Sequence, residues 1–180
     1  EAESPIKTIV AIYPGRFQPM GKHHAKVYDW LANQFGKSNT YVATSDKVDP
    51  PRSPFNFREK LQIIRKHGIQ NVVQEKNVYA PTNILKKYDT KTTAVVFVYG
   101  AKDAGRLKTT KADGTPAYFQ EYDKSKNNLK GFEEHGYFVI APHISLKVQG
   151  FGEMSGTSMR AALAGANPNV FKQIFGWFDP

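Results

Sequence analysis

Short apolar segments alternate with longer amphipathic segments along the whole of this sequence. The apolar segments are rich in β-branched and aromatic residues and end at turn residues, which is typical of buried strands. We predict five strands, at residues 6–13, 40–44, 71–75, 94–99 and 137–141, and leave open one more at 145–148. The fourth of these segments is apolar throughout, as expected for the middle of a parallel sheet.

The amphipathic segments between the strands predict helices. Apolar residues near helical spacing indicate a first helix over 24–35, and Asn56 can cap a second helix that stops at Gly68. Further helices are predicted at 82–88, near 117–123, at 155–164 and from 168 to 175. The alternation favours a doubly wound α/β fold, with a mainly parallel five-stranded sheet and helices on both faces. Ligands of such folds bind at the carboxyl ends of the strands.

Composition narrows the classes of function. A chain of 180 residues with 40% hydrophobic and 23% charged residues is expected to form a single globular domain, 1–180. The absence of cysteine excludes disulfides, thiolate zinc sites and a cysteine nucleophile, and it suits a reducing, cytoplasmic setting. No apolar run is long enough to cross a bilayer, and no signal peptide is present, so no membrane partner is expected.

The net charge of +9 predicts an anionic partner, which could be a nucleotide, a nucleic acid or an anionic lipid. The chain begins without methionine and ends in an apolar segment, 175–180, so it could be part of a longer protein. Exposed aromatic residues at that end could form an interface, including one in a homo-oligomer.

The loop after the first strand combines residues that suit a phosphate. Gly15, Arg16, Lys22, His23 and His24 lie between a buried strand and a helix. Glycines let backbone N–H groups approach an anion, and the helix N-terminus and the cations add positive charge. Neither a Walker A loop nor a Gly-x-Gly-x-x-Gly motif is present. A structural turn with basic surface residues fits the same composition.

Two distant motifs carry a resemblance to a known family. Segment 15–19 reads Gly-Arg-Phe-Gln-Pro and precedes a His-rich helix start, and segment 154–160 reads Met-Ser-Gly-Thr-Ser-Met-Arg. Together they resemble the nucleotidyltransferases with a His-x-Gly-His motif and a second motif, Ile-Ser-Ser-Thr-x-x-Arg. The first motif looks most like that of the adenylyltransferases acting on nicotinamide mononucleotide. The resemblance covers nearly the whole chain and implies a Rossmann-like fold.

The chain departs from the first motif at two positions. The family's first His corresponds to Gly21 and its Gly to His23, whereas its second His is retained as His24. His23 could supply an imidazole from a shifted position; otherwise the site carries one catalytic His.

The resemblance implies a reaction in which an acceptor phosphate attacks the α-phosphorus of ATP or CTP and pyrophosphate leaves. Such a reaction needs positioning and charge stabilisation more than an activated nucleophile. His24 is expected at the α-phosphate, with Arg16 and Lys22 as further phosphate contacts, and Phe17 belongs to the same motif. Mg²⁺ is the expected cofactor, bridging phosphates, and no protein metal site is expected.

A second anion site is predicted near the other end of the chain. Ser155, Thr157 and Ser158 lie at a helix start, where free N–H groups can bind the β- and γ-phosphates, although an ordinary N-cap is an alternative. The family resemblance implies that Arg160 touches the phosphate tail.

Two further segments hold candidate binding residues. The placement of segment 100–106 is similar to that of the family's segment near base and ribose, so Gly100 and Asp103 are expected at the ribose and Arg106 at phosphate. Lys47 resembles the family's acceptor-side position, and Arg58 could assist it. A solvated loop and surface cations are the alternatives.

Two functions from different classes therefore remain. The first is an adenylyltransferase with a phosphorylated acceptor, nicotinamide mononucleotide leading, with a cytidylyltransferase as its variant. The second is a domain that binds nucleotides or nucleic acid without catalysis. The basic segment 102–130 favours the second, because Tyr118, Phe119 and Tyr122 could stack on bases.

Overall fold

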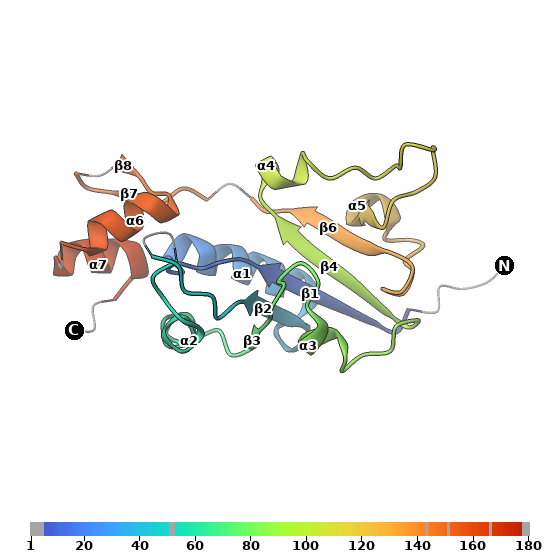
Figure 1. Cartoon of the computed structure of the whole chain (residues 1–180), viewed down its shortest axis with the longest axis horizontal. Helices are drawn as coiled ribbons and strands as arrows, with labels where there is room; N and C mark the ends of the chain where they lie inside the picture. The colour runs from blue at the N-terminus through green and yellow to red at the C-terminus, as the bar shows by residue number, and fades with distance from the viewer. Residues whose placement is uncertain (1–5, 51–52, 143, 151, 166, 178–180) are drawn as a thin grey trace.

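The computed structural model describes residues 6–50, 53–142, 144–150, 152–165 and 167–177. Its centre is a six-stranded sheet in the order β3-β2-β1-β4-β6-β5 (Figure 1). Every pair of neighbouring strands in it is parallel. The strands are β1 (Thr8–Pro14), β2 (Thr40–Thr44), β3 (Val72–Gln74), β4 (Thr93–Tyr99), β5 (Phe119–Glu121) and β6 (Gly136–Ile140). The parallel α/β architecture predicted from the sequence is confirmed, with one strand more than predicted.

The central strand β4 is buried on both faces. All seven of its residues are buried, and alternate residues enter two different cores. Val96 packs with Ala11 under α1 (Lys22–Phe35), whereas Phe97 packs with Val10 on the opposite face. A continuous apolar run is what such a strand requires.

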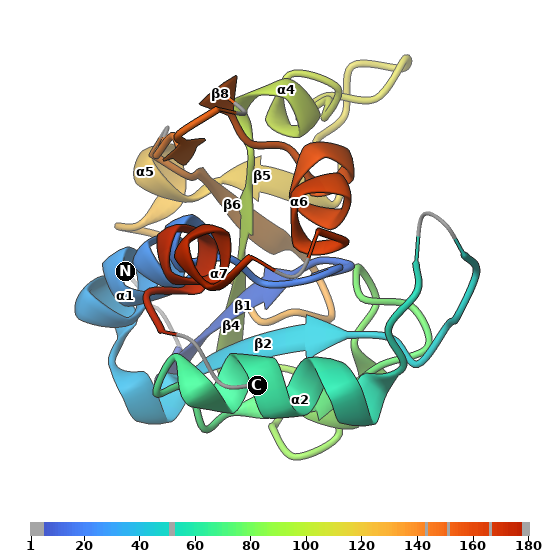
Figure 2. The ribbon, with the colours of Figure 1, turned by 90° about the vertical axis from the view of Figure 1, so that its left-hand side faces the viewer.

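Helices cover both faces of the sheet. The α1 face also holds α2 (Phe57–Lys66) and α5 (Tyr122–Ser125) (Figure 2). The opposite face holds two one-turn helices, α3 (Thr82–Leu85) and α4 (Ala101–Ala104). Asn56 caps α2 as predicted, because its side chain accepts the Glu59 N–H at 2.9 Å. A short 3-10 helix (Lys37–Asn39) leads from α1 into β2.

The helix predicted near 117–123 is wrong in its first half. Phe119–Glu121 forms the edge strand β5, and only the following turn is helical, as α5. The Phe119 ring lies against the ring of Phe97, with centroids 5.6 Å apart, and Phe119 pairs with Gly136 of β6. A Cβ on Gly136 would lie 2.8 Å from the Tyr118 ring. Tertiary packing therefore outweighs the local helical preference here.

The last part of the chain forms a small unit at one end of the molecule. A two-stranded antiparallel hairpin, β7 (Lys147–Val148) and β8 (Gly152–Glu153), precedes α6 (Gly156–Leu163) and α7 (Pro168–Phe175) (Figure 1). The segment 145–148, left open as a strand, thus contributes only β7, one strand of a hairpin outside the main sheet. Leu146, Met159 and Ile174 are among the residues of its own core. In the described part of the chain, no helix is both long and apolar enough to span a bilayer.

Candidate functional site

The loop between β1 and α1 lies at the carboxyl edge of the sheet, where strand order reverses between β1 and β4. Side-chain hydrogen bonds tie this loop to α2 and to the segment that precedes α2. The Gln18 amide donates to the Phe55 carbonyl at 2.9 Å and accepts the Phe55 N–H at 2.8 Å. From α2, the buried Lys60 ammonium donates to the Arg16 carbonyl at 3.2 Å and to Thr44 Oγ1 at 2.9 Å. The loop is therefore a held structure rather than a loose turn.

The turn at the start of this loop depends on close packing around Phe17. Phe17 is buried and has a positive φ of 46°, which is uncommon for a residue with a side chain. Its ring makes edge contacts with Tyr13 (centroids 5.0 Å apart) and with His24 (5.8 Å). A Cβ on Gly15 would lie 2.9 Å from the Phe17 ring, so only glycine fits there without displacing that ring. The predicted residues Gly15 and Phe17 thus shape the loop.

His24 lines both of the cavities at this edge, as do Arg16 and Phe17. Its Nδ1 accepts the Gly21 N–H at 2.9 Å. Burial, and then the charges of His23 and His67, lower the pKa of His24 to about 3. The imidazole is therefore neutral at physiological pH, with its proton on Nε2, so it offers a neutral hydrogen-bond donor.

One cavity, of about 300 Å³, joins the two predicted phosphate motifs. Arg16 lines it from the loop after β1, His24 lines it from the first turn of α1, and Gly156, Thr157 and Arg160 line it from α6. Arg160 Nη1 donates to the Gln18 carbonyl at 3.0 Å, and Nη2 lies 3.5 Å from Thr157 Oγ1. Segments from the two ends of the chain therefore build one basic cavity, as the two motifs predict.

A second cavity, of about 330 Å³, adjoins the first and shares Arg16, Phe17 and His24 with it. Gly100 and Asp103 line it as predicted, together with Tyr79 and Tyr99. The two tyrosine rings stack, with centroids 5.6 Å apart and planes 10° from parallel. Burial raises the pKa of Tyr99 far above its usual range, so its hydroxyl stays neutral. The tyrosine rings of this cavity offer an aromatic surface to a flat ring, and Asp103 offers a polar group to a ligand that carries hydroxyls.

Some predicted residues lie outside both cavities. Lys22 begins α1 without lining either one, and Arg106 pairs with Asp103 at 3.8 Å on the exposed side of α4. Lys47 and Arg58 are exposed, and neither lines the two cavities. The hydroxyls of Ser155 and Ser158 are engaged in capping α6, where Ser155 Oγ accepts the Ser158 N–H at 3.3 Å.

The charge of the two cavities is positive. Arg16 and Arg160 are the cationic side chains among their lining residues, and Asp103 is the carboxylate. In the described residues, no cluster of three or more His, Cys, Asp or Glu side chains could hold a metal ion. The site suits a phosphorylated ligand better than a metal bound by protein groups alone.

The structure corrects the prediction that three aromatic residues of segment 102–130 stack on bases. Phe119 and Tyr122 pack against the two cores of the main sheet. Tyr118 is exposed, but its hydroxyl donates to the Phe132 carbonyl at 2.5 Å and its ring contacts that of Phe119. This segment therefore presents no row of free aromatic rings.

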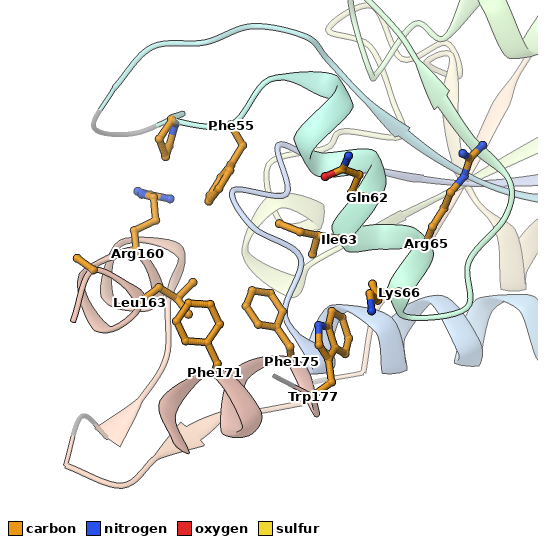
Figure 3. A pocket seen from close by; sticks show the side chains of 12 residues that line it. Phe55, Gln62, Ile63, Arg65, Lys66, Arg160, Leu163, Phe171, Phe175 and Trp177 are labelled. Carbon is orange, nitrogen blue, oxygen red and sulfur yellow. The ribbon is translucent and has the colours of Figure 1, made fainter. Parts of the chain in front are cut away.

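A third cavity, of about 940 Å³, was not predicted. It is an open groove between α2 and the C-terminal helices, which Figure 3 shows with Phe55 and Ile63 facing Phe171 and Leu163. Arg160 lines it as well as the basic cavity. Part of the terminal apolar segment, Phe175 and Trp177, packs in its wall, whereas residues 178–180 lie outside the described residues.

Comparison with known proteins agrees with this geometry. The cytidylyltransferase-like family matches residues 12–116. A curated relative, nicotinamide-nucleotide adenylyltransferase 1 of Sulfolobus acidocaldarius, is 29% identical over 55 residues. That alignment covers 31% of this chain and 31% of the relative, so it spans less than a third of the relative's length.

Solved structures share the fold. A protein described as a nicotinate-nucleotide adenylyltransferase from Vibrio parahaemolyticus matches with a TM-score of 0.55 and 17% identity over 94% of both chains. A bifunctional NMN adenylyltransferase/ADP ribose pyrophosphatase from Francisella tularensis matches with a TM-score of 0.55 and 19% identity. That match covers 97% of this chain and 46% of the other.

Proposed function

This chain belongs to the cytidylyltransferase-like family, and from that premise we propose that it is a nucleotidyltransferase that transfers the AMP group of ATP to a phosphorylated acceptor. The observation that carries the proposal is the shared cavity of His24 and Arg160. Their motifs lie near opposite ends of the chain, and either motif alone has an ordinary structural explanation. A basic cavity that also receives the N-terminus of the eight-residue helix α6 suits a chain of phosphates.

The proposed reaction is an in-line displacement. An oxygen of the acceptor phosphate forms a bond to the α-phosphorus of ATP, and the bond from that phosphorus to the bridging oxygen of the β-phosphate breaks. The bonding electrons leave with pyrophosphate, and no proton has to be removed from the ionised nucleophile. Catalysis then consists of positioning and of stabilising charge on the phosphoryl oxygens.

The roles of the residues follow from their positions. Neutral His24 donates from Nε2 to an oxygen of the α-phosphate, where negative charge develops. Arg160 and the N–H groups at Gly156 and Thr157 bind the β- and γ-phosphates, and Arg16 neutralises charge between the two cavities. Asp103 accepts from a ribose hydroxyl. Lys47 and Arg58 line neither cavity and receive no role here.

Mg²⁺ fits this donor set only as a partner of the phosphates. Among the lining side chains, the charged groups and the imidazole are two arginines, the neutral His24 and a single carboxylate, and one carboxylate cannot form an all-protein cage. The ion would enter bound to the triphosphate, and when bound it neutralises charge on the phosphate oxygens. Arg160 and Arg16 then bind the oxygens that the ion leaves free.

The leading acceptor is nicotinamide mononucleotide or its nicotinate counterpart. This choice is supported by the relatives described above, which are named as adenylyltransferases of nicotinamide and nicotinate nucleotides. The stacked Tyr79 and Tyr99 also offer an aromatic surface for a flat ring in the cavity beside His24.

Pyrophosphate release tests the proposal. The full chain is assayed with ATP and CTP against a panel of acceptor phosphates that includes both pyridine mononucleotides. We expect turnover with ATP and a pyridine mononucleotide; preference for CTP would instead make the chain a cytidylyltransferase. No turnover with any pair, in protein with a cooperative thermal transition, would refute the enzymatic proposal.

Two variants test the assigned roles. His24→Ala should lower kcat by about 100-fold while changing the affinity for ATP much less, because its contact strengthens in the transition state. Arg160→Gln should mainly weaken ATP binding, by about tenfold or more, because it removes a charged phosphate contact. Lys124→Gln is the matched control, because Lys124 is an exposed cation that pairs with Glu121 and lines neither cavity. A His24→Ala variant with unchanged kcat would contradict the assigned role.

A further inference from the structure

The backbone conformation of Gly21 does not require glycine. Its φ of −84° and ψ of 172° are open to any residue. The surrounding space is what excludes a side chain. A Cβ on Gly21 would lie 2.8 Å from both Cε1 and Nδ1 of His23 and 3.1 Å from the sulfur of Met159. The imidazole of His23 thus fills the volume into which a side chain of residue 21 would project.

From that volume the ring of His23 contacts the ring of His24. The two ring centroids lie 3.9 Å apart, with the planes inclined by 38°. Two further restraints on His24 are the Gly21 N–H, which donates to its Nδ1 at 2.9 Å, and the edge contact with the Phe17 ring. The backbone of Gly21 therefore holds one edge of the His24 ring. The His23 ring, which lies over Gly21, packs against one face of the His24 ring.

The contact of His23 is one of shape rather than of hydrogen bonding. Its Nδ1 is buried, and among the described residues it has no hydrogen-bond partner. His23 is also absent from the lining residues of the two cavities that His24 shares. A direct contact between His23 and a ligand in these cavities therefore has no support in the structure.

We propose that His23 is a positioning residue, whose ring over Gly21 holds the imidazole of His24 in the orientation that presents its Nε2–H to the ligand. The inference rests on the proposed function in one respect, the assignment of His24 to the reaction. The proposed role couples positions 21 and 23. One of the two residues must carry a ring, and either position can supply it. Exchanging the two residues conserves the ring and its volume.

Four variants test the pair. His23→Ala and His23→Gly remove the ring, His23→Phe keeps a ring without nitrogen, and Gly21→His combined with His23→Gly moves the imidazole to position 21. We expect the first two to lower kcat by about 10- to 100-fold with KM changed less than about threefold, as for a misplaced catalytic group. The phenyl variant and the exchange variant should each retain at least ten times the kcat of His23→Gly.

The tautomer of His24 provides a readout that needs no turnover. Imidazole ¹⁵N spectra of the full chain at pH 7 should show His24 as a single Nε2–H tautomer in the wild type, in His23→Phe and in the exchange variant. In His23→Ala and His23→Gly, mixed tautomers are expected. Thermal unfolding of each variant separates loss of position from loss of fold.

The outcomes separate the two proposals. A fixed His24 tautomer in the ring-free variants, or an exchange variant no better than His23→Gly, would overturn the positioning role. A wild type that shows the expected tautomer pattern but turns over no substrate would instead refute the proposed function alone.

Discussion

Replacing Lys60 with methionine tests how the loop after β1 is held. Lys60 is 1% exposed, and its ammonium contacts Arg16 and Thr44. Burial lowers the pKa of Lys60 from 10.5 to about 8, with Asp46 raising it and Arg16 lowering it to lesser extents. Methionine has a similar length and no charge, so it fills the same space.

The expected magnitude follows from this pKa. Because the folded pKa lies below the unfolded value, the unfolded chain binds the proton more tightly between about pH 8 and pH 10.5. The free energy of unfolding of the wild type therefore rises with pH through that window. The rise attributable to Lys60 is about 3 kcal/mol, at 1.36 kcal/mol per pKa unit. Below pH 8 the cost of the buried charge is fully present, and the two hydrogen bonds offset much of it.

Urea unfolding of the wild type and Lys60→Met, measured from pH 7 to pH 10, provides the assay. Other tyrosines and lysines titrate in both proteins, so their contributions cancel in the difference between the two curves. We expect that difference to grow with pH in favour of the wild type, by about 2–3 kcal/mol. Lys124→Gln should give a curve parallel to that of the wild type. Parallel curves for Lys60→Met would refute the reasoning, since they would mean that the amine of Lys60 titrates as in the unfolded chain.

Two further perturbations act on the same edge of the sheet. Acidification should destabilise the protein, because burial lowers the folded pKa of His23 to about 4 and of His24 to about 3. As the pH falls below 6.5, the unfolded chain takes up these protons before the folded protein does. The free energy of unfolding should therefore decrease by about 2 kcal/mol or more between pH 7 and pH 4.5. The decrease should be smaller in His24→Gln. Gln18→Leu removes both bonds to the Phe55 backbone and should cost about 1–3 kcal/mol in urea unfolding; an unchanged midpoint would show that the pair does not hold the loop.

The central sheet was predictable because most of its strands are apolar runs that can be recognised in the sequence. A strand such as β4, buried on both faces, is expected to be apolar along nearly its whole length, and residues 94–99 are. The edge strand β5 carries no comparable signal. It has three residues, and its pairing depends on Gly136 leaving room for the rings of Tyr118 and Phe119. The pairing of β5 therefore depends on tertiary contacts with β6 and cannot be predicted from residues 119–121 alone.

The candidate site was predictable where its chemistry lies in contiguous motifs. His24, Arg16 and Arg160 stand in two short segments, and topology brings those segments to one edge. Tyr79 gave no signal, because it reaches the cavity from an irregular connection between β3 and α3. Lys60 was not predicted as part of the site, although it lies one helical turn before the buried Ile64 and that spacing places it on the buried face of α2.

The guanidinium of Arg160 joins the C-terminal unit to the rest of the molecule at the Gln18 carbonyl. The same side chain faces the basic cavity, so attachment of that unit and occupancy of the cavity are thermodynamically linked. By this linkage, a ligand that binds Arg160 stabilises the attachment of the C-terminal helices. Detachment of these helices would remove the part of the cavity lining that α6 contributes. The central sheet and the C-terminal unit have cores of their own, so the residues that line this cavity come from two separately packed parts of the chain.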